Sequence, residues 1–183
     1  AGAFGIITRL LTFSFLPLLG LSMAFQTILG NNYGAKKLVR SNSTLKLAIT
    51  MALIYCTIVE LSFIVTRSEI AFVFVDDAAI ARELGRIMPY AVLLMFVFGP
   101  LMMIGTYFQA IGDAGRAALL GLSRTYLFAL PLTFLMPFWF GEPGIWYAGV
   151  VAEMLVLGLT IVVLRRRRYS EGKPWGLFEQ NEE

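Results

Sequence analysis

Four ionisable side chains interrupt otherwise apolar stretches of the sequence: Arg9, Glu60, Arg124 and Glu153. A charged side chain near the centre of a bilayer costs about 2.5–3.5 kcal/mol on insertion scales, so such residues usually have a function or a partner. Glu153 lies close to the middle of its apolar stretch, and Glu60 lies nearer to one end. Both carboxyl groups are therefore candidates for coupling to a cation or a proton.

Each of these residues also has a structural interpretation. A protonated Glu153 could form a hydrogen bond between two helices, and Glu60 could face water at the rim of a membrane. Arg9 lies near the start of its apolar stretch, where a long side chain can reach the lipid headgroups. Arg124 can reach the headgroups, or it can pair with a backbone carbonyl or a carboxylate, and anchoring is its simpler role.

The residue types that are missing exclude several kinds of chemistry. The sequence has no His and one Cys, Cys56. These counts exclude Ser–His–Asp and Cys–His catalysis, His-based metal sites and a disulfide framework. The apolar stretches hold no Asp-rich metal motif and no paired carboxylates at helical spacing. The net charge of +3 comes without the interleaved basic and aromatic residues of a nucleic-acid-binding protein. We therefore expect that the protein is not an enzyme and that it has no metal site, no cofactor and no nucleic-acid partner.

The composition indicates a membrane protein. Of the 183 residues, 58% are hydrophobic and 15% are charged, and the mean hydropathy is +0.75. Soluble domains are usually nearer half apolar and a quarter charged. A membrane-spanning helix needs about 20 mostly apolar residues. Five stretches qualify, which are 6–29, 45–66, 87–108, 117–140 and 144–164.

These stretches predict an all-α fold, a polytopic bundle of five transmembrane helices within residues 1–168. Pro17, Pro100 and Pro131 lie inside the stretches. They do not divide the spans, because neighbouring helices can bind the backbone groups that a proline frees.

Lys and Arg are concentrated in alternate connections. Residues 30–44 and the run 165–168 are basic, and residues 109–116 lead to Arg116 and Arg124, whereas 67–86 is slightly acidic and 141–143 has no cation. Cytoplasmic loops carry an excess of Lys and Arg. We therefore expect the first three of these segments in the cytoplasm and the N-terminal end of the chain outside.

Two further segments flank the spans. Residues 78–86 follow a short helical pattern with charges at Arg82, Glu83 and Arg86, and we expect an interfacial helix there that leads into the third span. Residues 169–183 are polar and charged, with Trp175, Leu177 and Phe178 among them. We expect a mobile cytoplasmic tail, and the alternative is that these apolar residues lie on the lipid headgroups.

The end of the first span reads GLSMAFQTILGNNYGAKK over residues 20–37. A helix that stops at Gly30 or Asn31 explains part of this phrase, because both residue types readily adopt a left-handed conformation. A helix stop does not explain the remaining residues of this phrase. The phrase resembles the pattern after the second helix of each half of the MATE (multidrug and toxic compound extrusion) transporters. The matching residues are Gly20, Leu21, Gln26, Gly30, Asn32, Gly34 and Ala35, while Thr27 stands where the family has Pro.

The resemblance continues downstream, in order, and covers residues 4–164. FVDDAAIARELGRIMPY (74–90) is similar to the segment before the fourth helix of the second half of these proteins. TYFQAIGDAGRAALLGLSR (106–124) is similar to a loop motif of the family. LPLTFLMPFWFGEPGIWYA (130–148) is similar to the passage into the last helix. The matching residues are Phe108, Gln109, Ala110, Ile111, Gly112, Arg124, Pro131, Gly144, Trp146 and Ala148.

The resemblance implies a fold and a function. MATE proteins have twelve helices in two lobes, and the five spans would be the eighth to the twelfth. The seventh helix and the N-terminal lobe would then be missing partners. The implied function is part of a multidrug efflux antiporter in the inner membrane. It would export small cationic amphiphilic compounds in exchange for H⁺ or Na⁺, with membrane lipid around it.

One departure bears on the coupling ion. Some sodium-coupled members of the family carry carboxylates on the seventh and tenth helices, but the counterpart of the tenth, residues 87–108, contains no acid. This favours proton coupling through the other lobe. An alternative function is that of a lipid-linked oligosaccharide flippase of the same superfamily, for which Arg9 and Arg124 would be the only cavity cations. A purely structural membrane subunit would not explain the motifs.

The drug cavity of the family is lined by apolar and aromatic side chains, which attract lipophilic cations. The candidates here are Met95, Phe98, Met102, Tyr107 and Tyr126. The competing interpretation is that these side chains meet lipid or neighbouring helices, as Met and aromatic residues of membrane helices commonly do.

The alternation of basic connections predicts the orientation of the chain in the membrane. A reporter fused after Arg168 should behave as cytoplasmic, and a Cys introduced at Glu142 should react with an impermeant reagent added outside. If position 142 is labelled only after the inner face of the membrane is made accessible, the orientation is the reverse of the predicted one.

Overall fold

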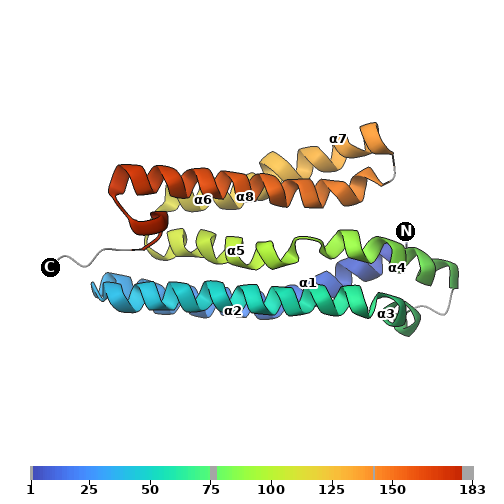
Figure 1. The fold of residues 1–183 in the computed structure, drawn as a ribbon, viewed down its shortest axis with the longest axis horizontal. Helices are drawn as coiled ribbons and strands as arrows, with labels where there is room; N and C mark the ends of the chain where they lie inside the picture. Colours follow the sequence, from blue (N-terminus) through green and yellow to red (C-terminus); the bar gives the residue numbers. More distant parts are fainter. Residues whose placement is uncertain (1, 75–77, 142, 179–183) are drawn as a thin grey trace.

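The computed structural model describes residues 2–74, 78–141 and 143–178, and within these residues the fold is helical without any strand. The expected all-α fold is thereby confirmed. Figure 1 shows long helices lying side by side along one axis. The elements are α1 (Gly2–Gly34), α2 (Leu38–Val65), α3 (Arg67–Phe74), α4 (Ala78–Val92), α5 (Met95–Ala110), α6 (Ala114–Leu122), η1 (Ser123–Ala129), α7 (Leu130–Phe140), α8 (Gly144–Glu171) and η2 (Pro174–Gly176).

Four helical segments among the described residues are long and apolar enough to cross a membrane. They are α1, α2, the continuous run α6–η1–α7 and α8. A fifth crossing results when α4 and α5 count as one broken span. These segments contain the five apolar stretches of the sequence. Asp76, Asp77 and Glu142, which belong to two of the connections, lie outside the described residues.

The stretch 87–108 is interrupted at Leu93–Leu94 rather than at Gly99-Pro100. The axes of α4 and α5 differ by 42° across this break. Leu94 adopts the left-handed conformation, with φ of 70°, which ends one helix and starts the next. Such a conformation is unfavourable for a residue with a Cβ, so surrounding contacts must hold it.

The expected interfacial helix over 78–86 is part of a longer helix, α4. Ala81, Leu84, Ile87 and Met88 of this helix are buried, and they share a small core with Phe63 of α2 and Ile7 of α1. Burial of this face explains why α4 packs against the bundle over its whole length.

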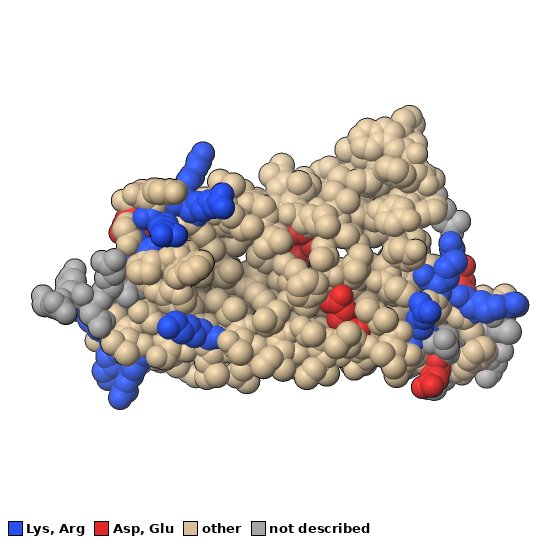
Figure 2. Space-filling view, in the orientation of Figure 1, with Lys and Arg blue, Asp and Glu red and all other residues tan. Residues whose placement is uncertain are grey.

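The connections gather at two ends of the bundle, which we name from the C-terminal segment. At the tail end lie residues 35–37 and 111–113 and the end of α8, and at the opposite end lie α3 and the connection between α7 and α8 (Figure 1). The three segments expected in the cytoplasm therefore meet at one end. Figure 2 shows Lys and Arg at both ends, whereas the middle of this face shows acidic side chains in two places among uncharged residues.

The C-terminal segment is not a mobile tail over residues 172–178. Leu177 is buried in the core with Leu45 and Phe108. Gly176 has φ of 72°, and a Cβ there would collide with the Leu164 carbonyl, so this glycine lets the chain fold back onto α8. Residues 179–183 lie outside the described part. The sequence of this segment is mainly polar, but Leu177 and Phe178 pack against the core.

The helices form two layers, with α1, α2 and α5 in one and α6, η1, α7 and α8 in the other (Figure 1). Small residues let α2 and α5 pack closely. Ala48, Ala52 and Cys56 are buried at every fourth position of α2, and Gly99 of α5 packs against two of them. Close approach over small side chains is a main source of helix association in membranes.

Substitution of Gly99 by Ala should destabilise the bundle. The added Cβ would stand 2.7 Å from the Cys56 sulfur and 2.8 Å from the Ala52 carbonyl oxygen, and the backbone oxygen cannot move aside. We expect a loss of about 1–3 kcal/mol in the free energy of unfolding, as for other overpacked sites. Thermal unfolding in detergent measures it.

Gly105, on the same helix, is the matched control. A Cβ there meets no atom within 4 Å, and Ala favours a helix over Gly by about 0.5–1 kcal/mol. Gly105→Ala should therefore be neutral or slightly stabilising. Equal behaviour of the two variants would contradict the close contact at Gly99.

Candidate functional site

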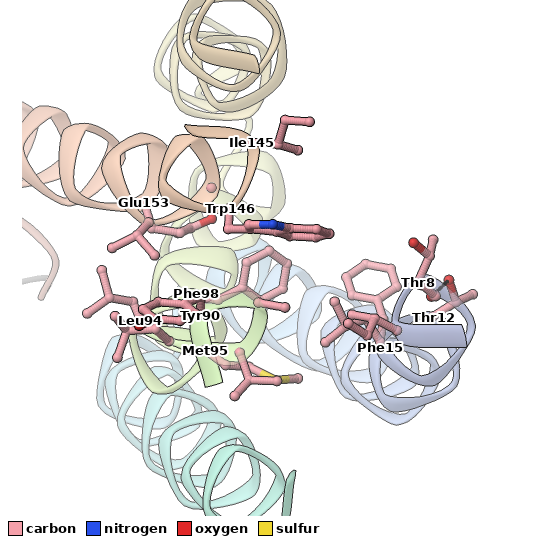
Figure 3. A pocket seen from close by; sticks show the side chains of 17 residues that line it. Thr8, Thr12, Phe15, Tyr90, Leu94, Met95, Phe98, Ile145, Trp146 and Glu153 are labelled. Atoms are coloured by element: carbon pink, nitrogen blue, oxygen red, sulfur yellow. Dashed lines mark hydrogen bonds between the residues drawn. The ribbon is translucent and has the colours of Figure 1, made fainter. Parts of the chain in front are cut away.

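A pocket of about 530 Å³ lies between the two layers. Its walls come from the first half of α1, the break between α4 and α5, and the first half of α8. Figure 3 shows that side chains from these three elements face a common space. The side chains labelled there are Thr8, Thr12, Phe15, Tyr90, Leu94, Met95, Phe98, Ile145, Trp146 and Glu153.

Glu153 is the charged side chain in the described lining of this pocket. Its Oε2 atom lies 3.4 Å from Arg124 Nη2, and the side chains of Glu153 and Arg124 are 18% and 21% exposed. The same oxygen accepts no hydrogen bond from any residue that the structure describes. The pair is therefore an ion pair without a close hydrogen bond, which is weaker than a charge-assisted bond at about 2.7–2.9 Å.

The position of Arg124 depends on a local widening of its helix. Residues Ser123–Ala129 form a π-helical segment, and the Leu130 N–H bonds to the Thr125 carbonyl five residues back. Pro131 follows directly and has no N–H for the Leu127 carbonyl. A missing donor favours such a widened turn. The Pro131 of the sequence motif thus explains how Arg124 comes to face Glu153.

An aromatic ring lies against this ion pair. The Arg124 guanidinium lies 4.3 Å from the centre of the Phe98 ring, within the range of a cation–π contact. Phe98 in turn makes an edge-to-face contact with Phe15 of α1, at 5.9 Å between ring centres. The site thus combines one carboxylate, one guanidinium and aromatic faces, an arrangement that suits an organic cation. No group of three Cys, Asp or Glu side chains within the described residues could hold a metal ion.

Of the five predicted cavity residues, two line the pocket and three do not. Met95 and Phe98 line the pocket. Met102 packs against the main core, and Tyr126 is 67% exposed on η1. Tyr107 is 2% exposed, and it lies near the tail end, away from the pocket lining.

Tyr107 belongs to a polar cluster that fastens the C-terminal segment. Its hydroxyl donates to the Leu177 carbonyl at 2.6 Å and accepts from Arg167 Nη1 at 2.9 Å. Arg167, which is 3% exposed, also donates to the Gly176 carbonyl and to Glu171. Arg116 joins Glu171 to Asp113 at the start of α6. The sequence analysis read residues 165–168 only as a basic run, but Arg167 is a buried structural residue.

Glu60 lies at the break between α4 and α5. It is 8% exposed, and its Oε2 accepts a hydrogen bond of 2.9 Å from the Phe96 backbone N–H. In an unbroken helix this N–H would bond to the Val92 carbonyl. The carboxylate of α2 therefore caps the first turn of α5, where a negative charge is favourable.

The residues of two of the family-like motifs, within 26–35 and 109–112, lie at the tail end. Gly34 ends α1, and Gly112 has φ of 80° in the connection between α5 and α6. Gly30 lies beside α5, where a Cβ would stand 3.5 Å from the Ala110 carbonyl. Gln26, Ala35 and Gln109 are exposed, and Asn32 is partly buried. These positions lie near the ends of α1 and α5 or in the connections that follow, and none of them lines the pocket, whereas the motif residue Trp146 of α8 does.

Sequence reasoning missed three aromatic residues of the pocket: Phe15, Tyr90 and Trp146. One signal was available on α8. Gly149, Val150 and Glu153 follow Trp146 by three, four and seven residues, so the four residues share one face of a helix. No comparable signal links Phe15 and Tyr90, which come from helices far apart in the sequence.

Comparison with known proteins gives consistent results. A sequence profile of the MatE family matches residues 2–135. The structure of the MATE multidrug transporter DinF-BH, solved in complex with a ligand, is similar, with 31% identity and a TM-score of 0.82 over 91% of this chain. No match was found among curated protein sequences.

Two further structures share the fold. The Vibrio cholerae MATE transporter VcmN matches 96% of this chain with 16% identity and a TM-score of 0.81. An outward-facing multidrug resistance MATE transporter of the MOP superfamily matches 92%, with 20% identity and a TM-score of 0.80. The matched regions are 37%, 40% and 38% of the three transporters, so this chain spans less than half of their length.

The capping contact of Glu60 predicts different outcomes for two substitutions. Glu60→Gln keeps an oxygen that can accept from the Phe96 N–H, so stability should stay near that of the wild type. Glu60→Leu leaves this N–H unpaired, which should cost about 1–3 kcal/mol in the free energy of unfolding. Thermal unfolding in detergent compares the variants. A Leu variant as stable as the Gln variant would show that the contact contributes nothing.

Proposed function

The chain belongs to the MatE family, and from that premise we propose that it is part of a multidrug efflux antiporter. The antiporter would export cationic amphiphilic compounds in exchange for H⁺ or Na⁺. Members of the family are membrane transporters rather than enzymes, and the apolar helices of this chain fit a multi-pass membrane protein. The solved relative at 31% identity is a multidrug transporter, which supports the proposed function.

The main support for this proposal is the negative charge of Glu153 in the pocket. Its described lining includes one charged side chain, Glu153, among mainly apolar and aromatic residues. A carboxylate next to aromatic faces favours a lipophilic cation by direct attraction and by cation–π contacts. An anionic substrate would meet repulsion from Glu153.

The Arg124–Glu153 ion pair would allow a cation to bind and to be released again. A cation that enters the pocket competes with Arg124 for the Glu153 carboxylate, and Arg124 keeps its contact with the Phe98 ring. Protonation of Glu153 removes the negative charge and releases the cation. Binding of a proton and binding of the substrate would then exclude each other, which is the requirement for exchange.

Transport also needs access from alternate sides of the membrane. In transporters built from repeated halves, the halves rock around a site near the midplane. The chain would supply one half, and its partners would be the remaining helices of the transporter and the surrounding lipid. We place the protein in the inner membrane with the tail end in the cytoplasm, because the basic connections meet there.

A lipid-linked oligosaccharide flippase of the same superfamily is the alternative. Such a substrate carries phosphate and would need cations along the cavity. Arg9 is exposed on α1 and is not part of the pocket lining, and Arg124 already faces Glu153. The arrangement therefore favours export of cations.

Glu153→Gln in the intact transporter should keep the fold, because Gln has the same shape and can still face Arg124. Energised efflux of ethidium should fall by about tenfold or more, the effect of losing roughly 1.4 kcal/mol of binding free energy. The residual efflux should depend less on pH than that of the wild type, since position 153 no longer carries a group that titrates.

Glu60→Gln is the matched control, because it removes a second buried carboxylate while an acceptor for Phe96 remains. Its efflux should stay close to that of the wild type. Wild-type efflux by the Glu153 variant at every pH would reduce Glu153 to a packing residue. It would also remove this pocket from the proposed mechanism.

A further inference from the structure

The last turns of α8 carry a group of exposed hydrogen-bond donors at the tail end. Arg165, Arg168 and Tyr169 are all exposed. They occupy positions i, i+3 and i+4 of one helix, so they form a triangle on one face. Neither the pocket between the layers nor the proposed transport cycle uses them. We propose that these three residues, the α8 headgroup site, bind the phosphate of an anionic phospholipid of the surrounding bilayer.

The exposed face of α8 changes from apolar to basic within one turn. Leu157 and Ile161 are exposed, and Arg165 and Tyr169 continue the same row at intervals of four residues. An exposed apolar row that ends in arginines is expected where lipid tails give way to headgroups. A phospholipid on this face would place its acyl chains along the apolar residues and its phosphate between Arg165 and Arg168.

The arginines of the α8 headgroup site differ from Arg167, which belongs to the same basic run. Arg167 is buried and hydrogen-bonded within the polar cluster that fastens the C-terminal segment. Arg165 and Arg168 form no ion pair with any residue that the structure describes. Glu171, the nearest acid in the sequence, already binds Arg116 and Arg167 through its two carboxylate oxygens. A phosphate would relieve the repulsion between the two exposed guanidinium groups through paired N–H donors.

The complete charge count favours an anion at this end of the bundle. Residues 30–46, 109–116 and 165–183, which meet there, hold ten Lys and Arg against five Asp and Glu. The rest of the chain holds five and seven. The positive excess of the chain therefore belongs to the tail end. Three of the five acids lie in residues 179–183, outside the described residues, and they compete with a lipid for the same arginines.

Trp175 adds an aromatic side chain beside the site. Gly176 packs against the Leu164 carbonyl, so Trp175 stands next to the last turns of α8. Trp175 is 74% exposed, and its φ of 57° is unfavourable for a residue with a Cβ. Leu177 and Phe178 pack against the core, whereas the fold holds Trp175 outward. An exposed Trp beside arginines is typical of the interface between membrane and water.

The test compares three ligands on the purified 183-residue chain in one detergent: phosphatidylglycerol, phosphatidylcholine and inorganic phosphate. Phosphatidylglycerol should raise the midpoint of thermal unfolding, and the other two should not. The double variant Arg165→Gln, Arg168→Gln should raise the phosphatidylglycerol concentration for half-maximal effect by about tenfold or more, as expected when charge-assisted contacts are lost.

The double variant Lys36→Gln, Lys37→Gln is the matched control. It removes the same charge from exposed residues at the same end of the bundle, but these residues are not part of α8. Its response to phosphatidylglycerol should stay close to that of the wild type. A diffuse attraction of lipid to the whole basic end would weaken the response of both double variants equally, whereas a site on α8 is lost only in the first.

Two single variants keep the test decisive if the double variant of α8 fails to fold. Arg165→Lys keeps the charge but loses the paired donors, and Tyr169→Phe removes one hydroxyl group. Both side chains are exposed, so the fold should not change. Each variant should weaken the response to phosphatidylglycerol, by less than the double variant does. Replacement of Glu179, Glu182 and Glu183 with Gln should leave the response in place.

Four outcomes would overturn the proposal. No response to phosphatidylglycerol, or one equal to that with phosphatidylcholine, would show that no anionic headgroup is recognised. An equal response to inorganic phosphate would assign the arginines to a free anion. Equal weakening in the Lys36 and Lys37 control, or a wild-type response in the α8 variants, would show that α8 holds no specific site. A response that appears only after Glu179, Glu182 and Glu183 are replaced would show that the chain's own acids occupy the arginines.

Discussion

A polar backbone group inside the hydrocarbon core of a bilayer finds no water, so its partner must come from the protein. The break between α4 and α5 follows from that constraint, and the buried C-terminal turn at the tail end is paired in the same way. At the break between α4 and α5, the freed Phe96 N–H binds the Glu60 carboxylate of α2. At the C-terminal turn, the carbonyls of Gly176 and Leu177 accept from Arg167 and Tyr107. Each of these departures from a straight helix is thus matched by a donor or acceptor from another element.

The break at Leu94 also shapes the pocket. The bend at Leu94 turns the start of α5 relative to α4, and the residues on both sides of the bend line the space. The layers are held together at the tail end, where Arg167 and Tyr107 join α8 to α5. Nearer the opposite end, the ring of Tyr90 on α4 contacts that of Tyr147 on α8, at 5.8 Å between ring centres. The pocket thus lies between two places at which the layers are in contact.

The helical class and the resemblance to a family could be predicted from the sequence, because the length of apolar stretches and short motifs are local properties. The sequence did not predict the break at Leu94, since Leu has no preference for a left-handed conformation. The cap that stabilises this break comes from Glu60, which lies 36 residues from Phe96. The sequence analysis also placed Tyr107 among the cavity candidates, because a buried aromatic ring and a cavity-facing one have the same local pattern. The Arg124–Glu153 pair joins two apolar stretches, and no spacing rule relates residues in different helices.

The buried charges divide into fixed and exchangeable groups. Arg167 has hydrogen bonds to Glu171, Tyr107 and the Gly176 carbonyl, so removal of any one partner leaves the others in place. Glu60 has a backbone donor that cannot leave without unfolding the start of α5. Arg124, in contrast, has a single ion pair of 3.4 Å and a ring face, and it lies on a π-helical turn. Such a turn can convert to an α-helical one by a shift of register, which would rotate Arg124 relative to Glu153. Of the two carboxylates, Glu153 is therefore the one whose charge can gain or lose a partner without loss of the fold, and this supports its role in coupling over that of Glu60.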